Sequence, residues 1–334
     1  MKKSNLKKII AFILKLSFVI TLCFYLFKKG YVSLSDTKTA LFQFNYIIPA
    51  FAFLMICTVL GIFRWKYLLQ TQQIILPTSR IFKLGLIGNF FNVALPGAVT
   101  GDIIKAVYTS KEAPDKRAYA LSSILFDRFI GVSALILISF FSVLFSFFSA
   151  SSKTLPAPFV LFVAGLGSLI FLFFIYLFLI PNNRDPIYKL LSKFKNKHNI
   201  INSLLRVIDG IKIYSVDKKC FAITLMISFI IHFLVISTVM LFLFSFGKMD
   251  LPFIEVMIVV PVGLLLIAVP ISPGGVGTGH AAFLGVFHLI GFDRGADVFT
   301  LFFIFKLFEG FVGAIVYLQF KAHITLPKDT VTAI

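Results

Sequence analysis

The sequence predicts an all-α polytopic membrane protein. Of its 334 residues, 59% are hydrophobic and 43 are Phe, and the mean hydropathy is +0.97. That is more apolar surface than one soluble core can bury. A helix needs about 20 apolar residues to cross a hydrocarbon core of about 30 Å. Six runs have this length, near residues 8–27, 45–63, 119–148, 157–180, 220–246 and 297–320.

The first of these runs follows the basic start MKKSNLKK. It is long enough to span a bilayer and has no clear small-residue cleavage site. We therefore expect a retained first helix rather than a removed signal peptide.

The net charge of +18 comes from basic residues that flank the apolar segments. No basic motif with interleaved aromatic residues occurs outside those segments, so nucleic acid is not an expected partner. Anionic lipid headgroups are the expected partner instead. The three Cys residues show no metal-ligand spacing, and we expect neither a metal nor a cofactor.

Two further apolar regions, about residues 81–112 and 253–291, are each interrupted by proline and glycine. The first break reads NVALPGAVTGDIIK and the second reads VPISPGGVGTGH. Each region is a broken spanning helix or a pair of half-helices that enters and leaves on one side. Re-entrant hairpins and an inside N-terminus place most of the 32 Lys and Arg residues inside, as is typical of cytoplasmic loops. The charge pattern thus favours six spans plus two re-entrant hairpins, with both termini cytoplasmic.

The order of these elements is span, span, hairpin, span, and the same order then follows again. Repeat one covers about residues 8–148 and repeat two about 157–320, within a single transmembrane domain. Repeat one starts inside and repeat two starts outside, so the two have inverted topology. The tip sequences PGAV, from Pro96, and PGGV, from Pro273, support this correspondence. Inverted repeats whose broken helices meet near the bilayer midplane recur among transporters.

The longest polar connection, about residues 181–219, joins the two repeats. Apolar residues recur in it at roughly helical spacing, with lysine and arginine among them. We expect amphipathic helices that lie along the cytoplasmic interface. They are either an ordinary connector or an element that recognises specific lipids.

Charged side chains inside the spans need partners, because a charge at the bilayer centre costs about 2.5 to 3.5 kcal/mol. Asp127 and Arg128 are adjacent and lie on diverging helix faces, so they do not simply satisfy each other. Arg128 is either a phosphate ligand, through two parallel hydrogen bonds, or the partner of a carboxylate on another helix. Lys306 and Glu309 are three residues apart, which favours a local ion pair that can open to a headgroup or a proton.

Polar residues also surround the first break. Asn89 and Asn92 share one helical face, and Asp102 and Lys105 open the returning half-helix. A helix that begins near Gly101 offers unpaired backbone N–H groups and a positive dipole end, as does the helix after the second break. Both helices can therefore face one phosphate. Asp102 either caps its helix or pairs with a cation, or it contacts substrate directly.

Two histidines lie in the apolar half of the chain. His280 directly follows the second break and is a candidate hydrogen-bond donor or proton acceptor. His232 lies in a span rich in Phe and Ile, and we expect a hydrogen-bonded core residue there.

Three stretches carry a resemblance to a known family: GNFFNVALPGAVTGDIIKAVYTSKE, AYALSSILFDRFIGVSAL and PISPGGVGTGHAAFLGVF. Over nearly the whole chain they resemble the lysylphosphatidylglycerol synthase transmembrane (flippase) family, the membrane half of the multiple peptide resistance factors. The resemblance implies movement of aminoacylated phosphatidylglycerol between leaflets. In that family a separate soluble domain attaches the amino acid, and we expect this chain to stand alone without it. Gly279 and His280 also replace an Arg-Glu pair of many relatives.

The expected substrate-binding and translocation residues come from two sources. The resemblance implies Asn92, Pro96, Gly97, Gly101, Asp102, Lys105, Asp127, Arg128, Pro273, Gly274, Gly275 and Gly277. The position of polar groups in the spans and breaks adds Asn89, Thr278, His280, Lys306 and Glu309.

These observations favour a lipid translocase of the cell membrane. It would move an anionic or aminoacylated phospholipid through a polar cavity at the interface of the repeats. A membrane-embedded transferase acting on a lipid headgroup is one alternative, although no catalytic constellation is found. A non-transporting membrane partner of a lipid-modifying synthase is another. A separate synthase and a second copy of this chain are thus the protein partners to consider.

Overall fold

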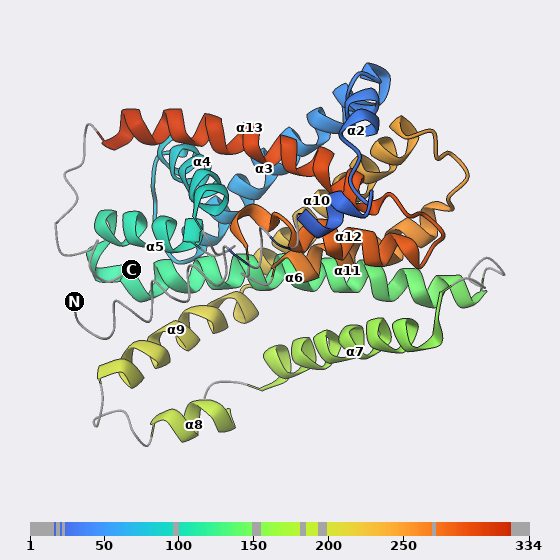
Figure 1. Cartoon of the computed structure of the whole chain (residues 1–334). Helices are drawn as coiled ribbons and strands as arrows, with labels where there is room; N and C mark the ends of the chain where they lie inside the picture. The colour runs from blue at the N-terminus through green and yellow to red at the C-terminus, as the bar shows by residue number, and fades with distance from the viewer. Residues whose placement is uncertain are drawn as a thin grey trace.

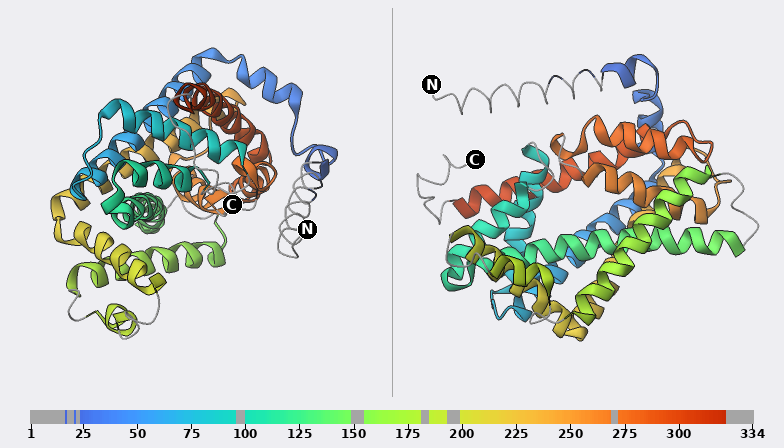
Figure 2. Two further views of the ribbon diagram at one scale, coloured as in Figure 1. Left: turned by 90° about the vertical axis from the view of Figure 1, so that its left-hand side faces the viewer. Right: turned by 90° about the horizontal axis from the view of Figure 1, so that it is seen from below.

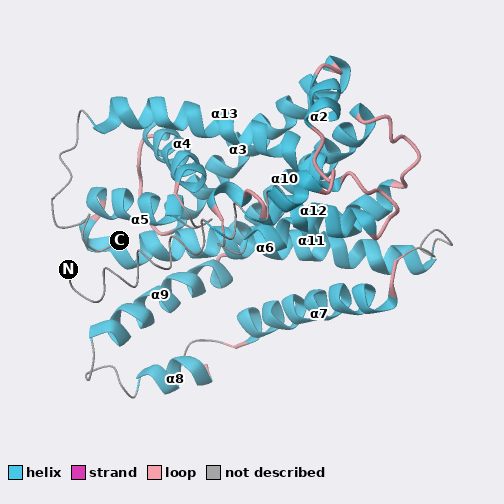
Figure 3. Ribbon diagram, in the orientation of Figure 1, coloured by secondary structure: helices cyan, strands magenta, loops and turns pink. Residues whose placement is uncertain are grey.

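The computed structural model describes residues 17, 21, 24–95, 100–148, 155–180, 185–192, 199–268 and 272–321. No strand occurs among these residues, and almost all of them lie in helices (Figure 3). The α-helices are α2 (Leu34–Leu41), α3 (Phe44–Thr71), α4 (Thr78–Ala94), α5 (Thr100–Glu112), α6 (Arg117–Phe148), α7 (Ala157–Leu179), α8 (Pro186–Ser192), α9 (Asn199–Val216), α10 (Lys218–Ser245), α11 (Phe253–Ala268), α12 (Thr278–His288) and α13 (Gly295–Lys321). Two 3-10 turns, η1 (Pro114–Lys116) and η2 (Pro273–Gly275), precede α6 and α12. The all-helical prediction is confirmed.

Helices long and apolar enough to cross a membrane occur at five places in the described chain. They match five of the predicted spans, whereas most of the run over residues 8–27 and the tip residues Pro96 and Gly97 lie outside the described residues. The helices are Phe44–Thr71, Pro114–Ser146, Ala157–Leu179, Lys218–Ser245 and Gly295–Phe320. The protein is therefore a multi-pass membrane protein.

Helix α3 is longer than the sequence predicts. It continues to Thr71 instead of ending near residue 63, so Arg64 lies within the helix and not in a loop. The apolar window ended at Arg64 because that residue is charged. The helix continues because Arg64 is buried and forms an ion pair with Asp127 of α6.

The first Pro/Gly break lies between two helices that fold back on each other. Arg80, near the start of α4, forms an ion pair with Glu112 at the end of α5. Near the other end, a Cβ on Gly101 would lie 1.9 Å from the carbonyl oxygen of Gly88. No residue larger than glycine fits at this crossing. Helices α4 and α5 therefore form an antiparallel hairpin.

Helices α11 and α12 form a second hairpin around the second break. Gly263, in the middle of α11, faces Phe283 in the middle of α12, and a Cβ there would lie 3.1 Å from the ring. The intervening turn contains Gly274 and Gly275 at φ of 55° and 80°, in the left-handed region that favours glycine. Both interrupted regions are thus pairs of packed helices.

The two hairpins make matching contacts. α4 packs on α13 and α11 packs on α6, while α5 packs on α6 and α12 packs on α13. α3 and α10 pack along each other (Figures 1 and 2). The α4 and α13 contact is close, since a Cβ on Gly313 would lie 2.2 Å from the Leu86 carbonyl oxygen. Each hairpin therefore packs between α6 and α13.

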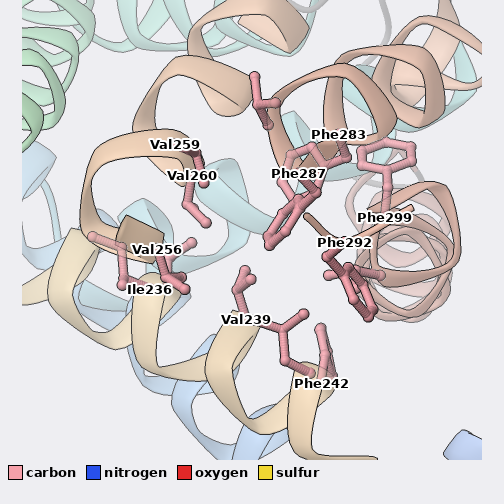
Figure 4. Packing of buried hydrophobic residues seen from close by; sticks show 14 of the residues in the cluster. Ile236, Val239, Phe242, Val256, Val259, Val260, Phe283, Phe287, Phe292 and Phe299 are labelled. Carbon is pink, nitrogen blue, oxygen red and sulfur yellow. The ribbon is translucent and has the colours of Figure 1, made fainter. Parts of the chain in front are cut away.

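A large cluster of buried apolar side chains holds the second hairpin in place. Figure 4 shows Val239 of α10, Val256 of α11, Phe283 of α12 and Phe299 of α13 within this cluster. All four side chains are buried. Hairpin α11–α12 is thus fixed against both α10 and α13 by apolar packing.

The polar connection between α7 and α10 contains two helices, α8 and α9, as the spacing of its apolar residues predicts. α9 is docked against α6, where a Cβ on Gly210 would lie 2.2 Å from the hydroxyl oxygen of Ser122. Asp185, just before α8, accepts a hydrogen bond from the Tyr176 hydroxyl at 2.8 Å and pairs with Lys212 of α9. α7 contacts α6 and α9 and lies at the edge of the bundle (Figure 1).

Candidate functional site

A polar cavity lies among the central helices and hairpins. It has two adjoining compartments of about 390 Å³ and 310 Å³. Side chains that line both compartments join them into one site. These shared side chains are Asn89, Asn92, Arg128, Leu264, Phe302 and Lys306.

One wall of the cavity contains a carboxylate held by two cations. Arg128 of α6 donates its Nε–H to Oδ2 of Asp102, and Lys105 Nζ lies 2.9 Å from Oδ1 of the same residue. The Asp102 side chain is 3% exposed, whereas that of Arg128 is 48% exposed. Arg128 lines both compartments. Asp102 is therefore an ion partner beneath the cavity surface, and the guanidinium faces the open space.

Asn92 orders the start of the returning helix. Its Oδ1 accepts a hydrogen bond at 2.9 Å from the backbone N–H of Gly101, in the first turn of α5. One of the unpaired N–H groups expected at this helix end is thus satisfied by a side chain of α4. Asn92 also lines both compartments, so the same residue shapes the cavity and holds the hairpin tip.

Asp127 does not pair with its neighbour Arg128. Its Oδ1 accepts a hydrogen bond at 2.7 Å from Nε of Arg64 on α3, and Arg64 also donates to Ser228 Oγ of α10 at 2.7 Å. Arg64 and Asp127 are each 11% exposed at the side chain. This ion pair connects α3, α6 and α10 at the border of the first compartment.

The Lys306 and Glu309 pair of α13 also lines the cavity. Lys306 Nζ donates to Glu309 Oε2 at 2.6 Å, as the spacing of three residues predicts. Glu309 Oε1 accepts a hydrogen bond from Thr58 of α3 and one from Asn89 of α4 at 3.4 Å. Glu309 is buried, while Lys306 is 37% exposed at the side chain. This pair repeats the pattern of Asp102 and Arg128, with a buried carboxylate under a more exposed cation.

The second hairpin tip forms the far end of the cavity through its backbone. Gly274 and Gly275, which follow Pro273 in η2, line the second compartment. Gly277 has φ of 77° and leads into α12. The Thr278 hydroxyl lies 2.7 Å from the Ser272 hydroxyl, within the tip itself. The glycines thus bring bare backbone to the cavity.

The two histidines differ in their relation to the cavity: His232 forms a hydrogen bond within the bundle, as expected, and also lines the cavity, whereas His280 does not line it. His280 Nδ1 accepts a hydrogen bond at 3.2 Å from the N–H of Gly277, and its ring packs edge-on against Phe299. His280 is buried and lines neither compartment. His232 lines the first compartment, and its Nε2 lies 2.9 Å from the carbonyl oxygen of Gly131. The histidine at the cavity is therefore His232.

The described side chains around the cavity leave a positive excess. Arg64, Lys105, Arg128 and Lys306 line it, and the carboxylates paired with them are Asp102, Asp127 and Glu309. With histidine counted as neutral, the positive charges exceed the negative charges by one. The excess arises at Asp102, which Lys105 and Arg128 share. The described residues hold no group of three or more His, Cys, Asp or Glu that could bind a metal ion.

Sequence comparison gives the chain a family. Residues 12–316 match the family described as the lysylphosphatidylglycerol synthase TM region. The chain belongs to this family. The match to the lysylphosphatidylglycerol synthase TM region extends over both hairpins and every residue that lines the cavity. Comparisons with curated proteins and with solved structures gave no match.

Proposed function

We propose that the protein is a lipid translocase that moves a phospholipid with an anionic or aminoacylated headgroup between leaflets. The observation that carries this proposal is the arrangement of Arg128, Asp102 and Lys105. A phosphate can replace Asp102 on the exposed guanidinium, because Lys105 continues to neutralise the buried carboxylate. A guanidinium also matches a phosphate through parallel hydrogen bonds.

The charge balance of the cavity supports a phosphodiester as the group that binds. One excess positive charge is neutralised by one monoanionic phosphate. Lys306 lines the same compartments as Arg128, with its own partner Glu309 beneath it. An amine on the headgroup finds an acceptor in Glu309 when Lys306 turns away. The cavity therefore suits a phosphate with an amine nearby.

We further propose that the two hairpins are re-entrant and belong to two inverted repeats with six spanning helices in total. The matching contacts of α4 on α13 and of α11 on α6 support this proposal, as does the similar sequence of the two tips. Arg128 of α6 and Lys306 of α13 then occupy corresponding places. The repeats would rock about the cavity while the acyl tails stay in lipid, in a cell membrane with both termini cytoplasmic. The sequence holds no nucleotide-binding motif, so movement is downhill or coupled to a gradient.

Lipid flux in proteoliposomes tests the role of Arg128. The purified chain is reconstituted with fluorescent phosphatidylglycerol, and transfer between leaflets is followed by dithionite quenching. We expect Arg128→Gln to lower the rate at least about tenfold, which corresponds to about 1.4 kcal/mol. Arg128→Lys retains the charge without the planar fork and should give an intermediate rate. Lys248→Gln removes a half-exposed cation that is paired with Asp250 outside the cavity, and it should leave the rate unchanged.

The outcomes of this assay separate the competing functions. Equal rates for wild type and Arg128→Gln would remove Arg128 from the mechanism. Absence of flux together with turnover of a labelled headgroup would favour a membrane-embedded transferase. Absence of flux together with co-purification of a lipid-modifying enzyme would favour a non-transporting partner of a synthase.

A further inference from the structure

A second cleft lies apart from the central cavity, where α5, the start of α6 and α9 meet. Its volume is about 680 Å³. α5 contributes Ser110 and Lys111, the start of α6 contributes Arg117, and α9 contributes Ser203 and Arg206. Both α5 and α9 pack on α6, so the walls of the cleft belong to packed helices and not to a loop.

The rim of the cleft is positively charged. Lys111, Arg117 and Arg206 line it, against Asp115 as the carboxylate in the described lining. The neighbouring Glu112 is engaged by Arg80 of α4. Arg117 and Arg206 are exposed, and Arg206 donates one long hydrogen bond, at 3.4 Å, to Ser203 Oγ, so both guanidinium groups can reach an anion. A phosphate suits such a rim, because each guanidinium can donate two parallel hydrogen bonds to it.

Apolar side chains also line the cleft, and exposed leucines continue from it along α6. Leu121 lines the cleft, and Leu125 and Arg128 follow on the same helix face. Their exposed fractions are 40%, 44% and 48%. At 1.5 Å per residue, Leu121 and Arg128 are about 10 Å apart along the helix axis. The stripe therefore connects the basic rim to the guanidinium of the central cavity.

We propose that this cleft is a loading site for the phosphate of an anionic phospholipid. The basic rim holds the phosphate, and the acyl chains lie against Leu121 and Leu125. The lipid then moves along α6 until Arg128 takes over the phosphate. Binding at the cleft stands on the geometry described here, whereas the transfer to Arg128 rests on the proposed function.

The exposed leucines favour a membrane lipid over a soluble anion. A soluble phosphate gains nothing from an apolar stripe beside its site, whereas the acyl chain of a lipid can pack against that stripe. The connector helix α9 then has a role in lipid recognition through Ser203 and Arg206.

Lipid binding to the full chain tests the cleft. Phosphatidylglycerol and phosphatidylcholine are titrated into the detergent-solubilised protein, and bound lipid is counted by native mass spectrometry. We expect Arg117→Gln/Arg206→Gln to weaken phosphatidylglycerol binding at least about fivefold, with little change for phosphatidylcholine. The matched control is Lys83→Gln/Lys219→Gln, which removes two exposed lysines outside the cleft. It should bind phosphatidylglycerol as wild type does.

Two results would overturn the proposal. One is equal phosphatidylglycerol binding by the cleft variant and the control variant. The other is competition by the deacylated headgroup, glycerophosphoglycerol, at the same concentration as the lipid, because the site would then take a soluble anion. All variants are first compared with wild type by size-exclusion chromatography, so that loss of fold is not read as loss of binding.

Flux measurements separate this proposal from the translocase proposal. If wild type transports lipid, the cleft variant should need more phosphatidylglycerol in the bilayer to reach half its maximal rate, while the maximal rate is retained. If wild type shows no flux, transfer along α6 is wrong, and the binding titration alone still decides whether the cleft holds lipid.

Discussion

The ion pair between Arg64 and Asp127 is the contact whose loss we expect to lower stability most. Both side chains are 11% exposed, and the Nε to Oδ1 distance is 2.7 Å. Asp127→Asn keeps the shape of the side chain and removes its charge. Arg64 then remains buried with the Ser228 hydroxyl as a neutral partner. A guanidinium inside the protein without its carboxylate is the source of the expected destabilisation.

The size of this effect follows from the burial of both partners. Removing one partner of a buried pair costs about 3 to 5 kcal/mol. Because Arg64 keeps its hydrogen bond to Ser228 and Asn can still accept one, the lower end of about 3 kcal/mol applies. That is roughly a hundredfold change in the unfolding equilibrium constant. The matched control is Asp250→Asn, which breaks a surface pair with Lys248 that is screened by solvent, so its loss should have much less effect.

Unfolding in mixed micelles measures both variants. The free energy of unfolding is obtained from titration with sodium dodecyl sulfate, followed by tryptophan fluorescence of Trp65, which lies beside Arg64 in the chain. The reasoning is refuted if Asp127→Asn and Asp250→Asn lose the same free energy. In that case the buried carboxylate contributes no more than a surface one.

Three further predictions concern other contacts. Gly101→Ala places a methyl group against the Gly88 carbonyl oxygen, and we expect the free energy of unfolding in the same titration to fall by at least about 2 kcal/mol. An unchanged free energy of unfolding would mean that α4 and α5 can move apart without cost. Glu309→Gln leaves Lys306 without its carboxylate, so phosphatidylglycerol should dissociate more slowly and flux should fall severalfold; faster flux would contradict this. Burial alone raises the pKa of the Asp185 carboxyl, but hydrogen bonds from Lys212 and Tyr176 outweigh it and lower that pKa. The stabilisation that ionised Asp185 gives the folded state is therefore present above the unfolded pKa of about 4 and is lost as pH falls through the lower folded pKa. Amide hydrogen exchange of α9 should become faster over that pH range in wild type. In Asp185→Asn it should show no such change.

The positions of the spanning helices could be predicted from the sequence, but most side-chain contacts between helices could not. Apolar length predicts α3, α6, α7, α10 and α13, because the bilayer requires that length of any spanning helix. The three-residue spacing of Lys306 and Glu309 predicts their pairing, since both lie on one helix turn. Contacts between residues three or four apart in one helix can be predicted from the sequence spacing alone.

Contacts between distant segments could not be derived in the same way. The apolar run near residues 45–63 stops before Arg64 because that residue is charged, and the partner that allows its burial, Asp127, is 63 residues away. One signal was present: Asp127 in an apolar span required a cation, and Arg64 in IFRWKYLL is flanked by apolar residues. His280 was expected to be available to substrate, yet its ring turns inward to the Gly277 N–H. Side-chain direction at a positive-φ turn depends on the packing around it, which sequence spacing does not specify.

The crossed packing of the hairpins has a consequence for how the chain is made. α4 packs on α13, and α13 is synthesised about 200 residues later, so on the ribosome this face of α4 lacks its α13 contact until α13 has been made. The Gly313 contact with Leu86 cannot form before that moment. This part of the fold is therefore completed only after α13 has been synthesised.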